Sequence, residues 1–169
     1  MNRTFGFTLV ELITAMAVIS LLVAIAVPSL QSFTMNDRLR TNINTLMGHL
    51  AFARSEAVKR SQQVAICSSG TATACNGNWS DGWLLYVDQD GDGSFDAGEE
   101  ILRAQQALDG NNSFTSIGIN DQITYDYRGY ATVDSIGSLQ LCDNRSGPHG
   151  KTVHIANTGR ARLERDTTC

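Results

Sequence analysis

Hydrophobic positions divide the chain into three stretches with different periodicities. Residues 7–30 are almost continuously apolar, and no charged side chain occurs from residue 12 to residue 36. Between residues 31 and 62, apolar residues recur every three or four positions, which predicts a helix with one buried face. From residue 63 onward, short runs of β-branched and aromatic residues alternate with turn residues, which is typical of antiparallel strands. The pattern predicts an α+β architecture, a long N-terminal helix packed on an antiparallel sheet.

The predicted elements can be placed along the chain from these runs. The stripe of the second helical stretch consists of Leu39, Ile43, Leu46, Met47, Leu50 and Ala57. Pro28 lacks an amide donor, so it can bend the helix without ending it. The predicted strands are residues 63–68, 83–88, 100–105, 122–127, 138–143, 152–156 and 161–165.

The apolar N-terminal run admits three interpretations: a secretory signal peptide, a plain transmembrane anchor, or an apolar helix retained for assembly. Its length is sufficient to cross the hydrocarbon layer of a membrane. Glu11 distinguishes the three, because a signal peptide has an uncharged apolar region and an anchor leaves the carboxylate unexplained. A carboxylate at this place needs a partner that offsets its desolvation.

The residues around Glu11 resemble a known processing signal. Gly6-Phe7-Thr8-Leu9-Val10-Glu11, followed by the apolar run and Pro28, is similar to the class III signal of type IV prepilins. The resemblance implies that a prepilin peptidase cuts between Gly6 and Phe7 and methylates Phe7. It also implies that Glu11 pairs with the N-terminal amine of a neighbouring subunit.

This resemblance implies a domain organisation and a location. Residues 1–6 would be the leader peptide, 7–30 the transmembrane and assembly helix, 31–62 the amphipathic half of the helix, and 63–169 a β-rich globular domain. The chain would cross the bacterial inner membrane once, with its C-terminal domain in the periplasm, and would then enter a pilus or pseudopilus. Its partners would be the prepilin peptidase, the membrane, and major and minor pilins that contact the N-terminal helix.

Further blocks narrow the resemblance to one family. ARSEAVKR, VAICSS, WSDGWLLYVD, EEILR and TGRAR occur in the order found in the GspH/FimT family of minor pilins and pseudopilins. The resemblance implies the type IV pilin-like fold. It also implies a subunit of a filament, without a required cofactor.

Four cysteines allow three disulfide pairings. Cys67–Cys75 would close a short polar loop, and Cys142–Cys169 would hold the C-terminus, so this combination is favoured. Export of the domain would place the cysteines in an oxidising compartment. A four-cysteine zinc site is the alternative, but no C-x-x-C pair supports it.

The acidic segment 88–99 has the ligand spacing of an EF-hand loop. Its acidic residues are Asp88, Asp90, Asp92, Asp96 and Glu99. Alternating carboxylates can surround one Ca²⁺ ion, and Gly93 permits the sharp turn. Because the flanking segments are predicted strands, this would be a calcium loop in a hairpin. The alternative is a solvated β-turn, which uses the same residue types.

Positive charge gathers near the C-terminus, although the formal net charge is -4. The motif Gly159-Arg160-Ala161-Arg162 places two arginines at a spacing of two, on the same side of a strand. Lys151 and Arg165 are candidates to join them, and such a group can bind phosphate oxygens. In FimT-like relatives, GRxR is associated with binding of DNA in natural transformation. The alternative is that these arginines pair with Glu164, Asp166 or another pilin.

The resemblance, together with the paired arginines, therefore implies a minor type IV pilin that takes part in pilus assembly and binds double-stranded DNA non-specifically. The alternative is the minor pseudopilin H of a type II secretion system, with a structural role and no DNA binding. An enzyme is not indicated, because the three histidines form no H-E-x-x-H pattern and no G-x-S-x-G nucleophile motif occurs.

Overall fold

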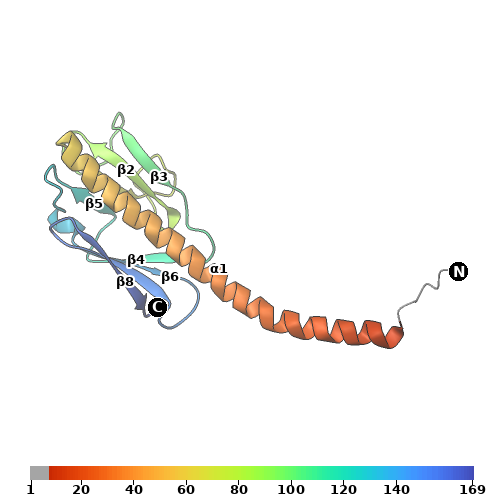
Figure 1. Ribbon diagram of the computed structural model, residues 1–169. Helices are drawn as coiled ribbons and strands as arrows, with labels where there is room; N and C mark the ends of the chain where they lie inside the picture. The colour runs from red at the N-terminus through yellow and green to blue at the C-terminus, as the bar shows by residue number, and fades with distance from the viewer. Residues whose placement is uncertain (1–7) are drawn as a thin grey trace. The chain divides into compact units, whose positions relative to one another are not determined.

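The computed structural model describes residues 8–169, in which one long helix precedes eight strands (Figure 1). Helix α1 runs from Leu9 to Arg60 and continues through Pro28. At its start, the Glu11 amide donates to Oγ1 of Thr8 at 3.2 Å, so Thr8 caps the first turn. The predicted cleavage and methylation at Gly6 and Phe7 lie outside the described residues.

The chain divides into two compact units, and the boundary falls between Asp37 and Arg38. In the first unit, the large apolar side chains of α1 are exposed, from 45% for Val27 to 73% for Leu9. By length and composition, α1 is the one helix within residues 8–169 that could cross a membrane. Exposed apolar side chains of this kind need either lipid or neighbouring helices to cover them.

The second unit contains two antiparallel sheets and the C-terminal part of α1, where a single sheet was expected. The first sheet has the order β3-β2-β1-β5 and consists of β1 (Gln63–Ser68), β2 (Trp83–Asp88), β3 (Ile101–Gln105) and β5 (Gln122–Tyr125). The second has the order β4-β6-β7-β8 and consists of β4 (Ser113–Ile117), β6 (Gly137–Cys142), β7 (Gly150–Ile155) and β8 (Ala161–Thr167). Two 3₁₀ turns, η1 (Trp79–Asp81) and η2 (Val133–Ser135), complete the unit.

The predicted strands are present, and β4 is the strand that the sequence analysis missed. Only Phe114 of β4 is buried, and its neighbours are exposed Ser and Thr residues. β4 is an edge strand of the second sheet, so one of its sides has no partner strand. With a single buried side chain, it does not show the apolar alternation that predicts a strand. The strand predicted over residues 122–127 ends earlier, at Tyr125, since a turn begins at Asp126.

One hydrophobic core joins the helix to both sheets. Figure 1 shows the C-terminal part of α1 with β2 and β3 on one side of it and β4, β5, β6 and β8 on the other. The expected stripe of α1 faces this core: Leu39, Ile43, Leu46, Leu50 and Ala57 are buried, and Met47 packs against them. Burial of this stripe removes apolar surface from water and fixes the helix on the sheets.

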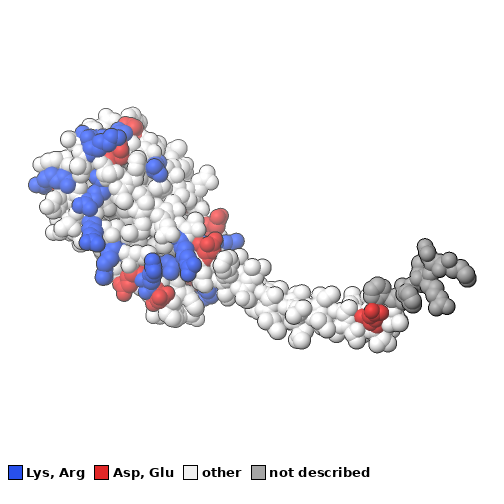
Figure 2. Space-filling model, in the orientation of Figure 1, with Lys and Arg blue, Asp and Glu red and all other residues white. Residues whose placement is uncertain are grey.

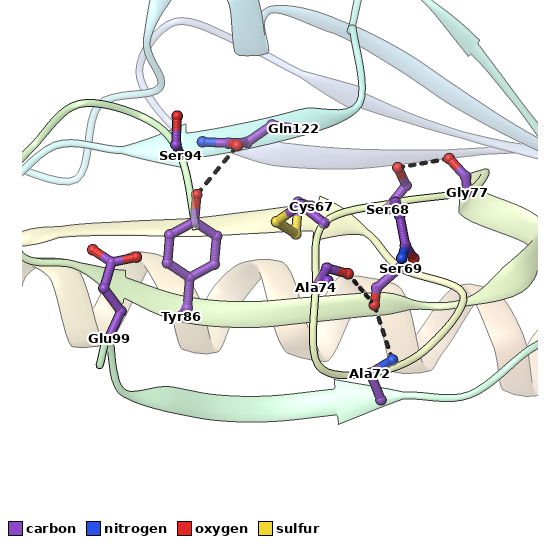
Figure 3. The surroundings of a disulfide bond; sticks show 12 residues. Cys67, Ser68, Ser69, Ala72, Ala74, Gly77, Tyr86, Ser94, Glu99 and Gln122 are labelled. Carbon is purple, nitrogen blue, oxygen red and sulfur yellow. Dashed lines mark hydrogen bonds between the residues drawn. A yellow bond between two sulfur atoms is a disulfide. The ribbon is translucent and has the colours of Figure 1, made fainter. Parts of the chain in front are cut away.

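The first sheet is also covered on its other face, by the two loops of the β1–β2 and β2–β3 connections. Tyr86 packs with Cys67 in a second small cluster, and its ring meets that of Phe95 at a centroid distance of 5.0 Å. The Tyr86 hydroxyl donates to Oε1 of Gln122 at 3.2 Å (Figure 3). Burial raises the pKa of Tyr86, and the nearby charges of Asp88 and Glu99 raise it further. Strands β1 and β2 are therefore buried on both faces.

Both disulfides are the pairs that the sequence analysis favoured. Cys67–Cys75 closes the loop after β1, and Cys142–Cys169 joins the end of β6 to the C-terminus. The hydroxyl of Ser69 donates to the Ala74 carbonyl at 2.7 Å and accepts from the Ala72 amide at 3.0 Å, which fixes the first loop (Figure 3). Within residues 8–169 there is no free cysteine, so the zinc alternative is wrong.

Candidate functional site

The turn between β7 and β8 carries the GRxR motif. The Gly159 amide donates to the Ala156 carbonyl at 2.9 Å, and the Ala156 amide donates to the Arg160 carbonyl at 3.1 Å. Gly159 has a φ of 74°, and a Cβ atom placed on it would collide with the Gly129 carbonyl oxygen. A residue with a side chain does not fit here, because this positive φ is strained for residues other than glycine and because the Cβ atom would collide with a backbone oxygen. The glycine of the motif therefore shapes the turn that presents Arg160.

Arg54 of α1 holds this turn against its neighbour. Its Nε donates to the Gly129 carbonyl at 2.9 Å, and its Nη2 donates to the Thr158 carbonyl at 2.9 Å. This role of Arg54 could not be predicted from the sequence, because both acceptors are backbone atoms, 75 and 104 residues away along the chain. Hydrogen bonds from a cationic group to carbonyl oxygens are stronger than neutral ones, so Arg54 fixes the two turns together.

Arg160 and Arg162 lie on one side of the second sheet, where they line a common hollow of about 590 Å³. Both side chains are exposed, and neither forms an ion pair with a carboxylate of residues 8–169. Glu164, the expected alternative partner, instead places its Oε2 2.7 Å from Nε2 of His154. The two guanidinium groups are therefore available to an external anion.

Lys151 and Arg165 are not brought to the same place. They line a separate hollow of about 380 Å³ together with Arg40 of α1. Leu163 lines this hollow too and packs on the core, so Arg165 follows the helix side of β8 while Arg162 points to the other face. Arg165 lies five positions after Arg160, a distance of about 16 Å along an extended chain. The four basic residues that were predicted to act together therefore form two separate groups, Arg160 with Arg162 and Lys151 with Arg165.

Figure 2 shows the distribution of charge over one face of the second unit. Lys and Arg side chains form a band along its left and lower edges, and carboxylates interrupt the lower end of this band. Within residues 8–169, no ion pair joins a carboxylate of segment 88–99 to Arg160 or Arg162. The carboxylates that follow this segment pair elsewhere: Glu100 with Arg60, and Asp126 with Arg128. A local basic surface therefore exists on a chain with net negative charge.

The acidic loop between β2 and β3 brings its carboxylates together in two overlapping groups. Within each group the ligand atoms lie within 4.8 Å of one another, and the groups are Asp88, Asp90 and Glu99, and Asp90, Asp92 and Asp96. Asp88 is 2% exposed and accepts hydrogen bonds from the amides of Gly91 and Gly93, at 2.7 and 3.1 Å. Burial raises the pKa of Asp88 despite these bonds. The loop is a hairpin connection whose oxygens can hold a hard cation such as Ca²⁺.

The fold resembles those of two crystallised proteins at low identity. The type IV minor pilin FimU of Pseudomonas aeruginosa matches with a TM-score of 0.61 and 20% identity, over 79% of this chain and 93% of the crystallised FimU chain. The minor pseudopilin EpsH of the type II secretion system of Vibrio cholerae matches with a TM-score of 0.59 and 11% identity, over 80% of this chain and 99% of the crystallised EpsH chain. The long helix packed on antiparallel sheets is therefore the type IV pilin-like fold.

Sequence comparison narrows the class to a family. The model of the type II transport protein GspH matches residues 42–159, and that of the prokaryotic N-terminal methylation motif matches residues 1–27. The pilin-like protein PilA1 of Thermus thermophilus is 30% identical over an alignment of 169 positions, which covers 94% of this chain and 97% of PilA1. The chain belongs to the GspH family of minor pilins and pseudopilins, which are structural subunits.

Proposed function

We propose that this minor pilin takes part in type IV pilus assembly and binds DNA non-specifically through Arg160 and Arg162 during natural transformation. The observation that carries the proposal is the pair of exposed guanidinium groups at one hollow, without an acidic partner in the part of the chain that the structure describes. A guanidinium group binds phosphate through two parallel hydrogen bonds. Contacts to phosphates carry no sequence information, so binding would be independent of sequence.

Binding of double-stranded DNA by the full-length protein in detergent tests the proposal. The variant Arg160→Gln, Arg162→Gln is compared with Lys151→Gln, Arg165→Gln, which removes the same charge from the second basic group. The first variant should lose most of its affinity and lower the slope of log affinity against log salt by about 2, because each phosphate contact contributes about 0.9. The second variant should keep most of its affinity.

An equal loss in both variants would contradict the assignment of the site to Arg160 and Arg162, because binding would then depend on general charge. Full affinity in the first variant would contradict it as well. Circular dichroism of each variant, compared with the wild type, establishes that the sheets are intact.

For assembly, we propose that a prepilin peptidase cuts between Gly6 and Phe7 and methylates Phe7. The match to the methylation motif and the exposed apolar surface of α1 support this proposal. Glu11, in the first turn of α1, would pair with the N-terminal amine of the neighbouring subunit, and Pro28 would allow the helix to adapt to its neighbours. Residues 7–30 would anchor the chain in the inner membrane before assembly, with the globular domain in the periplasm.

The alternative function is that of the minor pseudopilin H of a type II secretion system. The GspH family model and the fold shared with EpsH favour it. The two functions differ in the effect of deleting the gene: loss of DNA uptake is expected for the pilin, and loss of protein secretion for the pseudopilin.

A further inference from the structure

Two exposed tyrosines flank an arginine on the turn after β5. Tyr127 is 56% exposed and Tyr130 is 50% exposed. The guanidinium carbon of Arg128 lies 5.2 Å from the Tyr127 ring centroid and 5.6 Å from that of Tyr130. At these distances a guanidinium group is attracted to the rings, so the three side chains form one cluster. Half-exposed aromatic rings on a surface turn are available to a partner with planar apolar groups.

This turn, Asp126–Tyr130, is held in one conformation. Oδ1 of Asp126 accepts hydrogen bonds from the amides of Arg128 and Tyr130, both at 2.9 Å, and its Oδ2 accepts one from Nε of Arg128 at 3.1 Å. Burial tends to raise the pKa of Asp126, but the bonds from Tyr130 and Arg128 outweigh it, and the pKa is lowered. The carboxylate therefore stays ionised and holds the backbone of the turn and the Arg128 side chain, which reduces the entropy lost on binding a ligand.

The aromatic turn and the GRxR turn are in direct contact. The amide of Ala131 donates to the Asn157 carbonyl at 3.0 Å. The Nε and Nη2 atoms of Arg54 join the Gly129 and Thr158 carbonyls, and Gly159 packs on Gly129. The tyrosine cluster and Arg160 are therefore carried by two turns that cannot move independently. Aromatic rings beside cationic groups are the usual composition of a surface that binds single-stranded nucleic acid.

An apolar hollow lies beside the same two turns. Its volume is about 590 Å³, and its walls include Leu50, Ala51 and Val58 of α1 as well as Gly159 and Arg160. Val58 also borders the aromatic turn, since a Cβ atom on Gly129 would lie 3.0 Å from Cγ2 of Val58. A planar base fits a space of this size and apolar character, and Arg160 at its edge can hold the adjacent phosphate.

We propose that the turn Asp126–Tyr130 binds unpaired bases, so that the protein prefers single-stranded to double-stranded DNA. This inference rests on the proposed function, because Arg160 and Arg162 would hold the phosphates while Tyr127 and Tyr130 stack on the bases. A duplex keeps its bases stacked inside and cannot offer their faces to the two rings. The tyrosines therefore contribute to the binding of single strands alone.

Binding of oligo(dT) and of a duplex of the same length by the full-length protein in detergent tests the inference. The variant Tyr127→Ala, Tyr130→Ala should bind oligo(dT) about a hundredfold more weakly, because each of the two stacked bases contributes roughly a factor of ten. Its affinity for the duplex should not change. The matched control, Tyr127→Phe, Tyr130→Phe, keeps the rings and should bind oligo(dT) like the wild type.

The outcomes separate this inference from the proposed function. Equal affinity of the wild type for both DNAs, or full affinity of the Ala variant for oligo(dT), would overturn the inference and leave the role of Arg160 and Arg162 intact. Absence of binding to either DNA would overturn both. Unchanged oligo(dT) binding together with poor filament incorporation of the Ala variant would show that the tyrosines contact another pilin. The single variants Tyr127→Ser and Tyr130→Ser replace the double variant if it does not fold.

Discussion

Glu56 is a charged residue of α1 that is buried. It is 7% exposed and accepts hydrogen bonds from Nε of Arg60 at 2.7 Å and from Nζ of Lys59 at 3.2 Å. Arg60 also donates to both carboxylate oxygens of Glu100, at 2.6 and 3.1 Å. These contacts join the last turn of α1 to the residue before β3. The sequence analysis did not assign Glu56 to the buried stripe, because a glutamate next to two cations is typical of an exposed helix face.

Replacement of Glu56 by Gln should lower the free energy of unfolding at pH 7. The bonds from Arg60, and then from Lys59, hold the pKa of Glu56 below its usual 4.5. A lowered carboxyl pKa stabilises the fold above pH 4.5, and this stabilisation is lost as the pH falls through the folded-state pKa. The difference between wild type and variant should therefore narrow below pH 4.5. Urea unfolding at a series of pH values measures it.

The variant Glu100→Gln is the matched control. Glu100 also pairs with Arg60, but its side chain is 53% exposed, so its replacement should have the smaller effect. A Glu56→Gln effect of equal size at pH 7 and pH 3 would contradict this account, because Glu56 would then act through packing alone.

At the scale of elements, the acidic loop between β2 and β3 offers a direct test of calcium binding. Its five acidic residues were predicted to bind Ca²⁺, and the hairpin brings them into two groups. A bound ion would join β2 to β3 and stabilise the second unit, so the thermal midpoint should rise with calcium and fall again with a chelator. The variant Asp90→Asn, Asp92→Asn should abolish the calcium response.

Magnesium at the same concentration is the control for general screening of charge. An equal midpoint with calcium, with magnesium and with the chelator would contradict the calcium prediction and favour a solvated turn. Asp88 is left unchanged in the test variant, because its hydrogen bonds to Gly91 and Gly93 hold the loop itself.

Elements with a strong apolar pattern could be predicted from the sequence, and others could not. The buried stripe of α1 and the runs of β1 and β2 follow from side-chain periodicity. Strand β4 shows one buried side chain, and the division into two sheets depends on which strands pair across long distances, so neither has a local signature. Pairing order is a property of the packed chain and not of any one segment.

In the candidate site, too, local features could be predicted from the sequence, and contacts between distant segments could not. Strand alternation places Arg160 and Arg162 at one hollow, as expected. The same alternation, together with the burial of Leu163, separates Lys151 and Arg165 from them, and sequence spacing could not show which face meets α1. Arg54 and the tyrosine turn escaped notice because their contacts form only when distant turns meet.

For the whole molecule, the proposed assembly helix and the proposed DNA-binding surface belong to different units of one chain. Glu11 and the apolar run belong to the first unit, while the hollow of Arg160 and Arg162 belongs to the second. The two roles should therefore be separable by mutation. Glu11→Ala should lower the amount of this protein in sheared filaments, and Arg160→Gln, Arg162→Gln should not.

Uptake of labelled DNA by cells that carry these chains is the most direct test of the central claim. With filament incorporation measured in parallel, Arg160→Gln, Arg162→Gln should reduce uptake while the protein still enters the filament, and Lys151→Gln, Arg165→Gln should leave uptake near that of the wild type. Normal uptake by the Arg160→Gln, Arg162→Gln strain would contradict the claim and leave the chain as an assembly subunit whose arginines contact another pilin.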